Sequence, residues 1–281
     1  RNAGAGGYTN YVHPLQETRM IRPGLVSITF RKLSAHEICR WAAAAGLEGI
    51  EWGGDVHVPV GQLGTAAHVA DLTRDHGLKV AAYGSYHRLG VSEADDWDRT
   101  LETAVELGAS IFRVWCGEAG SADADEATRA KVVEAGRRAA ETAAAAGVTV
   151  ACEWHGNTLT DTAASAQMLF DAVDHPAFQT YWQPHKKMGF ADCLNDMDTA
   201  LPRMVGVHVF QWHLETVERQ ELAEGQGLWP TYLRQAKTCP RLAGGGDMYA
   251  LLEFVRNDDP AQLMADAPIL RQWLNEVNAS R

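Results

Sequence analysis

One unit recurs along the sequence: an Ala-rich or amphipathic stretch, then a glycine, then a short apolar run. A glycine at that place accepts the left-handed backbone conformation that ends a helix, so each unit predicts a helix followed by a strand. The unit is clearest in residues 41–52, 75–86, 106–115 and 142–154. Helices that alternate with apolar strands predict a parallel sheet covered by helices.

Eight apolar runs are strand candidates, and every segment between them has room for a helix. They lie near residues 25–30, 47–52, 80–83, 111–115, 148–153, 180–183, 205–210 and 250–254, and a last helix is expected from about 260 to 274. Eight such units predict a single-domain α/β fold, a (β/α)₈ TIM barrel over residues 20–281. An open, doubly wound sheet is the alternative. It is disfavoured because no G-x-G-x-x-G motif or P-loop follows the first strand.

The composition limits the partners of the protein. Of the 281 residues, 46% are hydrophobic and 22% are charged, as in ordinary globular domains. No apolar run approaches the roughly 18 residues of a membrane span, so no membrane partner is expected. The net charge of −11 repels polyphosphates, so nucleic acid is not expected as a partner either. A homo-oligomer is left open.

The first residues and the cysteines bear on processing and compartment. Residues 1–19 are polar and Gly-rich, and Met20 stands directly before the first strand-like run. We therefore expect residues 1–19 to be a leader or tail with little structure and no catalytic role. The five cysteines are an odd number without a C-x-x-C pair, so neither a disulfide framework nor a zinc knuckle is expected. The simplest location for such a chain is a reducing cytoplasm.

Polar side chains end five of the otherwise apolar strands. They are Glu51, Glu153, Gln183, His208 and Glu253. The carboxyl ends of the strands form the site in a TIM barrel, and burying an unpaired carboxylate costs several kcal/mol, so these groups should share a partner. Carboxylates, an amide oxygen and an imidazole suit a divalent metal ion, Mn²⁺ or Mg²⁺ first, and are compatible with Zn²⁺, Co²⁺ or Ni²⁺.

The competing interpretation gives each of these residues a separate structural role. Glu153 would pair with an arginine, His208 would be a core histidine with satisfied hydrogen bonds, and Gln183 would bond to the backbone. For any one residue, the two interpretations are about equally good. Chance rarely places three or four such residues at the same level of successive strands, so the shared site is favoured.

The chain resembles the xylose isomerase-like superfamily of sugar isomerases and epimerases, which also contains the apurinic endonucleases. The resemblance covers residues 21–274 and is carried by LVSITF, GLEGIEW, VACEWHGNTLTDT, YWQP, VGVHVFQW, the stretch 221–229 and LLEFVRND. It implies metal ligands at Glu153, Gln183, His208 and Glu253. The family usually has Asp where this chain has Gln183. With only two carboxylates the ion should bind more weakly but act as a stronger Lewis acid.

The leading hypothesis for function is a metal-dependent isomerase or epimerase that moves a proton next to a sugar carbonyl through an enediolate. Glu153 and Glu253 would be its catalytic residues, one removing the proton and the other returning it. The alternative enzyme is a lyase or dehydratase of a keto-sugar, an inosose or a 3-keto-glycoside, which needs the same metal and bases. A third hypothesis, from another class, is a barrel that binds sugar or joins a complex without catalysis.

An apurinic endonuclease is disfavoured. His57 and His87 follow the second and third strands and could mimic two of its ligands, but Gln183 replaces a required acid, and the chain is strongly acidic overall. We therefore expect a small-molecule carbohydrate as the substrate.

The remaining candidates are side chains expected to bind that substrate. Five of the nine tryptophans, Trp52 among them, lie at or just beyond strand ends, where flat indole faces suit the apolar faces of a sugar ring, although core packing is the alternative. Polar groups near the same ends would bind hydroxyls. The full set is Glu51, His155, Trp115, Trp154, Trp182, Trp212, His185, His213 and Arg256.

Overall fold

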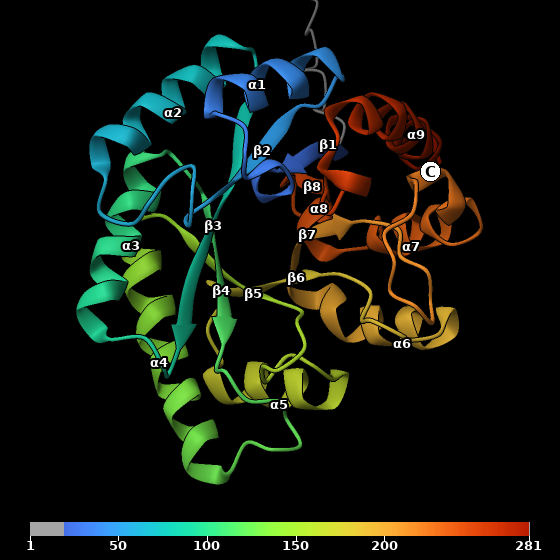
Figure 1. The fold of residues 1–281 in the computed structure, drawn as a ribbon. Helices are drawn as coiled ribbons and strands as arrows, with labels where there is room; N and C mark the ends of the chain where they lie inside the picture. Colours follow the sequence, from blue (N-terminus) through green and yellow to red (C-terminus); the bar gives the residue numbers. More distant parts are fainter. Residues whose placement is uncertain (1–19, 281) are drawn as a thin grey trace, which may run out of the picture.

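Eight parallel strands form a closed barrel surrounded by helices (Figure 1), as the sequence predicts. The computed structural model describes residues 20–280, so the expected leader, residues 1–19, lies outside the described residues. The strands are β1 Ile21–Val26, β2 Gly49–Gly53, β3 Lys79–Leu89, β4 Ile111–Cys116, β5 Thr149–Glu153, β6 Phe178–Trp182, β7 Met204–Val209 and β8 Met248–Leu252. Each strand pairs with its sequence neighbours, and β8 closes the barrel on β1.

Helices follow the strands and form the outer layer. They are α1 Ala35–Ala44, α2 Leu63–Asp75, α3 Ala94–Glu106, α4 Glu126–Ala145, α5 Ala163–Val173, α6 Phe190–Ala200, α7 Trp229–Ala236, α8 Pro240–Ala243 and α9 Pro260–Ala279. The expected last helix is confirmed and is longer than predicted. Among the described residues, no helix is long and apolar enough to cross a membrane.

The first expected strand is shifted. The run 25–30 was predicted as extended, but β1 ends at Val26 and Ser27–Phe30 forms a 3₁₀ helix. The hydroxyl of Ser27 accepts a hydrogen bond from the backbone N–H of Gly53 and also contacts His57. A side chain thus takes over hydrogen bonding at the end of this strand, which an apolar sequence run does not reveal.

Side chains alternate between two cores along the strands, because successive residues of a strand point to opposite faces. The interior of the barrel is filled by a small apolar cluster that includes Ile111, Ala151, Tyr181 and Leu251. The residue two positions after each of these is polar and faces the same interior. The residues between them belong to the larger core beneath the helices, as Cys152, Trp154, Trp182 and Leu252 do.

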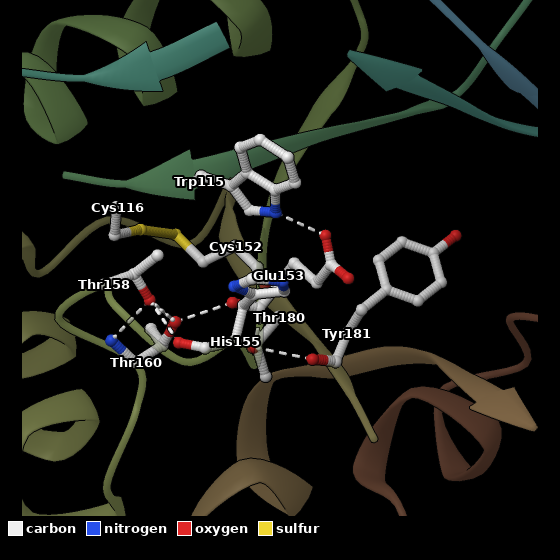
Figure 2. The surroundings of a disulfide bond; sticks show 9 residues. All are labelled: Trp115, Cys116, Cys152, Glu153, His155, Thr158, Thr160, Thr180 and Tyr181. Atoms are coloured by element: carbon white, nitrogen blue, oxygen red, sulfur yellow. Dashed lines mark hydrogen bonds between the residues drawn. A yellow bond between two sulfur atoms is a disulfide. The ribbon is translucent and has the colours of Figure 1, made fainter. Parts of the chain in front are cut away.

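A disulfide joins the carboxyl ends of β4 and β5, between Cys116 and Cys152 (Figure 2). The expectation that the cysteines form no such bond is therefore corrected. The parallel register pairs Val114 with Cys152, which brings Cys116 beside the same strand end although 36 residues separate the two cysteines. Cysteine number and spacing carry no information on strand register. Cys39, Cys193 and Cys239 are free and buried.

This bond can be mapped directly. Digestion of protein alkylated under denaturing, non-reducing conditions should release one linked peptide pair containing Cys116 and Cys152, while the other three cysteines carry the alkyl label. Prior reduction should leave all five labelled. Full labelling without reduction would contradict the assignment.

Packing inside the barrel also supports His208, one of the strand-end residues. A Cβ atom on Gly206 of β7 would lie 2.1 Å from Cε1 of Tyr181. The ring of Tyr181 stacks on the imidazole of His208, with 4.9 Å between the ring centroids. The absence of a side chain at Gly206 therefore lets Tyr181 support His208.

We expect Gly206→Ala to lower the free energy of unfolding by about 1–3 kcal/mol, because the added methyl group overpacks the barrel. The control is Gly64→Ala in α2, where a Cβ meets nothing within 4 Å. Its helix propensity predicts a gain of up to about 1 kcal/mol. Urea unfolding of both variants checks this, and equal midpoints would contradict it.

Candidate metal centre

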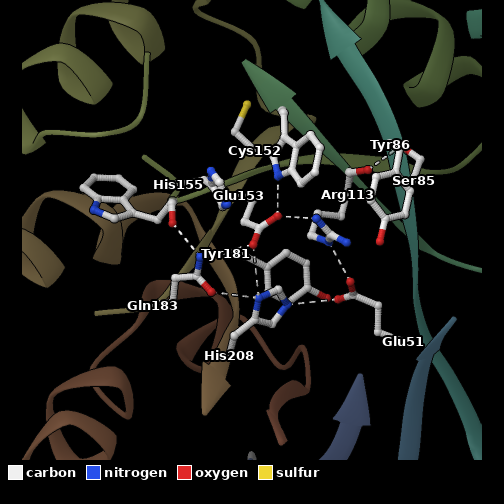
Figure 3. Close-up of polar contacts among 12 residues, drawn as sticks. Glu51, Ser85, Tyr86, Arg113, Cys152, Glu153, His155, Tyr181, Gln183 and His208 are labelled. Carbon is white, nitrogen blue, oxygen red and sulfur yellow. Dashed lines mark hydrogen bonds and ion pairs between the residues drawn. The ribbon is translucent and has the colours of Figure 1, made fainter. Parts of the chain in front are cut away.

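Six buried polar side chains meet inside the barrel near the carboxyl ends of the strands. Figure 3 shows all but Glu253. They are Glu51 on β2, Arg113 on β4, Glu153 on β5, Gln183 directly after β6, His208 on β7 and Glu253 directly after β8. Five of the six are the strand-end residues singled out in the sequence, and the barrel brings these five together.

Arg113 is the member that sequence reasoning missed. Its Nε donates to Oε1 of Glu51 at 2.6 Å, and its Nη1 donates to Oε2 of Glu153. The side chain is only 2% exposed, so this cation is buried between two carboxylates. The signal in the sequence is a charged residue inside the apolar run IFRVW, in the middle of a strand and not at its end. Arg113 and the two glutamates stabilise one another, because removing any one of them would leave a buried charge unpaired.

Glu51 lies deeper than expected for a substrate-binding residue. β2 continues to Gly53, so Glu51 is in the body of the strand and fully buried. Burial alone would raise the pKa of Glu51, but the charges of Arg113 and His208 outweigh it and lower that pKa to about 2. The side chain is therefore a fixed anion inside the barrel, and its expected contact with substrate is corrected to contacts with Arg113 and His208.

Glu51 orients the imidazole of His208. Nε2 of His208 lies 3.1 Å from Oε2 of Glu51, and an ionised carboxylate can only accept, so Nε2 carries the hydrogen. The other nitrogen, Nδ1, faces Oε1 of Gln183 at 3.3 Å, Oε2 of Glu253 at 3.5 Å and Oε1 of Glu153 at 3.8 Å. Burial alone would lower the pKa of His208, but the charges of Glu51, Glu253 and Glu153 raise it, so a proton on Nδ1 is favoured among these oxygens. A cation bound there would displace that proton and take the Nδ1 lone pair, and a carboxylate behind a ligating histidine is a usual partner in metal sites.

The donor set fits a divalent cation. One ligand atom from each of Glu153, His208 and Glu253 lies within 4.8 Å of the others. Oε2 of Glu253 is buried and accepts no hydrogen bond from any described residue. Burial raises the pKa of Glu253 to about 7. The charge of His208 opposes this rise, and the charge of Glu153 adds to it. An unpartnered carboxylate oxygen among other oxygen and nitrogen donors is the environment that such an ion would satisfy.

The two glutamates of this group have unlike surroundings. Glu153 accepts hydrogen bonds from Arg113 and the indole of Trp115 on Oε2, and from Nε2 of Gln183 at 3.1 Å on Oε1. Burial opposes ionisation of Glu153, yet the charge of Arg113 keeps its pKa below the usual value. Glu153 is therefore held in place as an anion, whereas, within the described part of the chain, Oε2 of Glu253 accepts no hydrogen bond and has only the longer contact of 3.5 Å to Nδ1 of His208.

A cavity of about 430 Å³ opens above the centre, and we call it the inner chamber. Glu153 and Gln183 line it together with three of the expected substrate-binding residues, His155, His185 and Trp212. Nδ1 of His155 lies 2.6 Å from the carbonyl oxygen of Gly156. A carbonyl only accepts, so Nδ1 carries the hydrogen in the neutral ring, and Nε2 keeps its lone pair.

Two of the expected aromatic walls lie elsewhere. Trp154 and Trp182 are fully buried in the core beneath the helices. The indole of Trp154 donates to Asp196 of α6, and the ring of Trp182 packs on Tyr232 of α7 with centroids 5.3 Å apart. Their expected role in substrate binding is corrected, since each is next to an inward-facing site residue and must point outward. Trp115 does face the interior, where it bonds to Glu153.

The other expected contacts are peripheral. His213 is exposed and lines a neighbouring cavity. Arg256 forms an ion pair with Glu221 at 2.8 Å and does not line the inner chamber. Neither of the endonuclease-like histidines faces the centre: His57 bonds to Ser27, and His87 packs on Trp97.

Comparison with known proteins gives a family match and a named relative. The model of the xylose isomerase-like TIM barrel family matches residues 39–238. A 3-dehydroshikimate dehydratase of Bacillus anthracis is 31% identical over 163 residues, which are 54% of this chain and 58% of that protein. The match therefore spans less than two thirds of that relative.

Two solved structures show the same fold. The probable 3-DHS dehydratase AsbF of Bacillus anthracis superposes with a TM-score of 0.74 at 21% identity, over 89% of this chain and 99% of that one. The D-allulose 3-epimerase of Methylomonas sp. gives 0.65 at 17% identity, over 91% and 98%. At these identities the likeness concerns the barrel alone.

The role of Glu51 behind His208 leads to a prediction on metal binding. We expect Glu51→Gln to weaken Mn²⁺ binding about 10- to 100-fold, because the amide no longer fixes the tautomer that presents Nδ1. Glu48→Gln is the control, since Glu48 pairs with Arg22 at the protein surface. Titration calorimetry with Mn²⁺ measures both. Equal affinities for the two variants would show that Glu51 does not support a metal ligand.

Proposed function

The chain belongs to the xylose isomerase-like TIM barrel family, and from this premise we propose that it is a metal-dependent lyase. Its substrate would be a keto-sugar or a related cyclic hydroxyketone, from which it removes water or an alcohol. The sequence alone favours isomerisation or epimerisation and gives a lyase as the alternative. The name of the Bacillus anthracis relative, a dehydratase, supports elimination.

The observation that carries the proposal is the unequal bonding of Glu153 and Glu253. An epimerase with two carboxylate bases needs both to accept and release a proton on opposite faces of the substrate. Glu153 is held by Arg113, Trp115 and Gln183, which favours its ionised form throughout. Elimination makes a smaller demand, because a single group can take the proton from carbon and then deliver it to the leaving oxygen.

We assign the two glutamates, with His208 and Gln183, to holding the ion. Nε2 of Gln183 donates to Glu153 and to the carbonyl oxygen of Trp154, which leaves its Oε1 on the side of His208. The donor types favour Mn²⁺ or Mg²⁺. When bound, such an ion polarises the substrate carbonyl and stabilises the negative charge that develops on its oxygen.

His155 would be the proton carrier. Its Nε2 is the basic nitrogen of the neutral ring, and the ring lines the inner chamber beside Glu153. Nε2 takes the proton from the carbon next to the carbonyl, the C–O bond at the next carbon breaks, and the same proton goes to the departing oxygen. The products are an unsaturated ketone and one molecule of water or alcohol, and His155 returns to its starting state.

A small panel of substrates tests the reaction. The protein with Mn²⁺ or Mg²⁺ is incubated with 3-dehydroshikimate, an inosose, a 3-keto-glucoside and a ketose, and the products are weighed by mass spectrometry. Loss of water or alcohol from a keto substrate supports the lyase. An unchanged mass with deuterium uptake from solvent would favour the isomerase or epimerase. No metal-dependent change in any substrate would favour a barrel that binds without catalysis.

A substitution tests the proton carrier separately from the metal. We expect His155→Gln to lower the rate of elimination about 10²- to 10⁴-fold and to leave Mn²⁺ affinity unchanged, because the variant loses only the base. His68→Gln, on the exposed side of α2, is the matched control and should keep full activity. Full activity of His155→Gln would move the role to Glu253.

A further inference from the structure

A second cavity adjoins the inner chamber, and we call it the outer chamber. It has a volume of about 300 Å³. Both chambers are bounded by Pro184, His185, Lys186, Met188, Phe210 and Trp212. The two spaces therefore lie on either side of the same side chains, which come from the segments that follow β6 and β7.

The two chambers differ in chemistry. The inner chamber has the ionisable and amide side chains of the centre and of the loop after β5. The outer chamber has an aromatic wall of Phe190, Trp229 and Tyr232, in which the ring of Tyr232 lies 5.3 Å from that of Phe190 and 5.5 Å from that of Trp229. Sugar hydroxyls placed directly against these three rings would lose hydrogen bonds to water without replacement. Apart from the shared residues, the polar side chains that line the rest of this chamber are Lys187, Gln211, His213 and Gln220.

The entrance of the outer chamber carries exposed apolar side chains beside the polar Lys186, Lys187 and His213. Phe190 is 37% exposed and Leu214 is 53% exposed, and both line this cavity. Phe190 continues the aromatic wall of Trp229 and Tyr232 to the surface, so an aryl group could reach this wall from solvent. Lys186 lies at the boundary, where its Nζ sits 4.8 Å from the centre of the Trp212 ring. This long side chain can move without any change in the backbone.

We propose that the substrate has two parts, a polar ring in the inner chamber and a flat apolar group, of the aryl class, in the outer chamber. This inference rests on the proposed function for the placement of the polar ring. Each cavity is within the range of about 300–1,000 Å³ that encloses small ligands. A small hydroxyketone bound in the inner chamber would therefore leave the outer chamber unfilled. An aryl group attached through oxygen would stack on the aromatic wall.

The experiment measures binding without turnover. Protein loaded with Mn²⁺ is titrated with 4-nitrophenyl β-D-glucopyranoside, methyl β-D-glucopyranoside and 4-nitrophenol in a calorimeter. Burial of the aryl group should make the nitrophenyl glucoside bind about 10- to 100-fold more tightly than the methyl glucoside. Equal affinity of the two glucosides, or no binding of either nitrophenyl compound, would overturn the proposal.

Variants place the aryl group in the outer chamber. Phe190→Ala should weaken binding of the nitrophenyl glucoside about 2- to 10-fold and leave the methyl glucoside unaffected, while Phe190→Trp should keep the affinity. Met168→Ala is the control, because Met168 is 62% exposed on α5 and lines neither chamber. The proposal is wrong if Phe190→Ala and Met168→Ala bind the nitrophenyl glucoside equally well.

Failure of this inference can be told from failure of the proposed function. The glucosides have no ketone and cannot undergo the elimination, so their binding does not depend on it. A preference for the aryl glucoside without turnover of any keto substrate would support the outer chamber and contradict the lyase. Turnover of 3-dehydroshikimate without an aryl preference would do the reverse.

Discussion

The interior of the barrel is organised around one buried cation, the guanidinium of Arg113. Without it, two carboxylates on β2 and β5 would be buried without a counter-charge, at a cost of several kcal/mol each. With it, Glu51 stays ionised and can orient His208, and Glu153 stays ionised beside the other donors. The group that would hold a metal ion is thus connected through hydrogen bonds to a residue outside that group.

Most of this fold can be predicted because local sequence patterns determine its helices and strands. The helix, glycine and strand unit is local, and it predicted the eight-stranded barrel. The strand-end residues were also predictable, since the carboxyl ends of parallel strands meet at one end of a barrel. Arg113 was missed because it lies in the middle of a strand and not at its end. The disulfide was missed because it depends on the register between two strands.

For the tryptophans, the alternation of side chains along a strand decides whether the indole faces the barrel interior or the helices. Trp154 follows Glu153, and Trp182 precedes Gln183, so in an extended strand each must face away from its polar neighbour. Because both tryptophans are next to a site residue in the sequence, they are expected to form a wall of the site. Side chains of a strand alternate between its two faces, however, so both rings lie under the helices. Applying that alternation to the strand ends would have separated these two from Trp115, which faces the interior and bonds to Glu153.

The same alternation has a consequence for how proteins of this kind diversify. On β5, Cys152 faces the outer core and is tied to β4, while the next residue, Glu153, faces the candidate metal centre. Outward positions maintain the scaffold, whereas the charged inward positions Glu51, Arg113 and Glu153 compensate one another and cannot be exchanged singly without cost. A substitution at a neutral inward position such as Gln183 would therefore change the group of donors without leaving the charge of Arg113 unpaired.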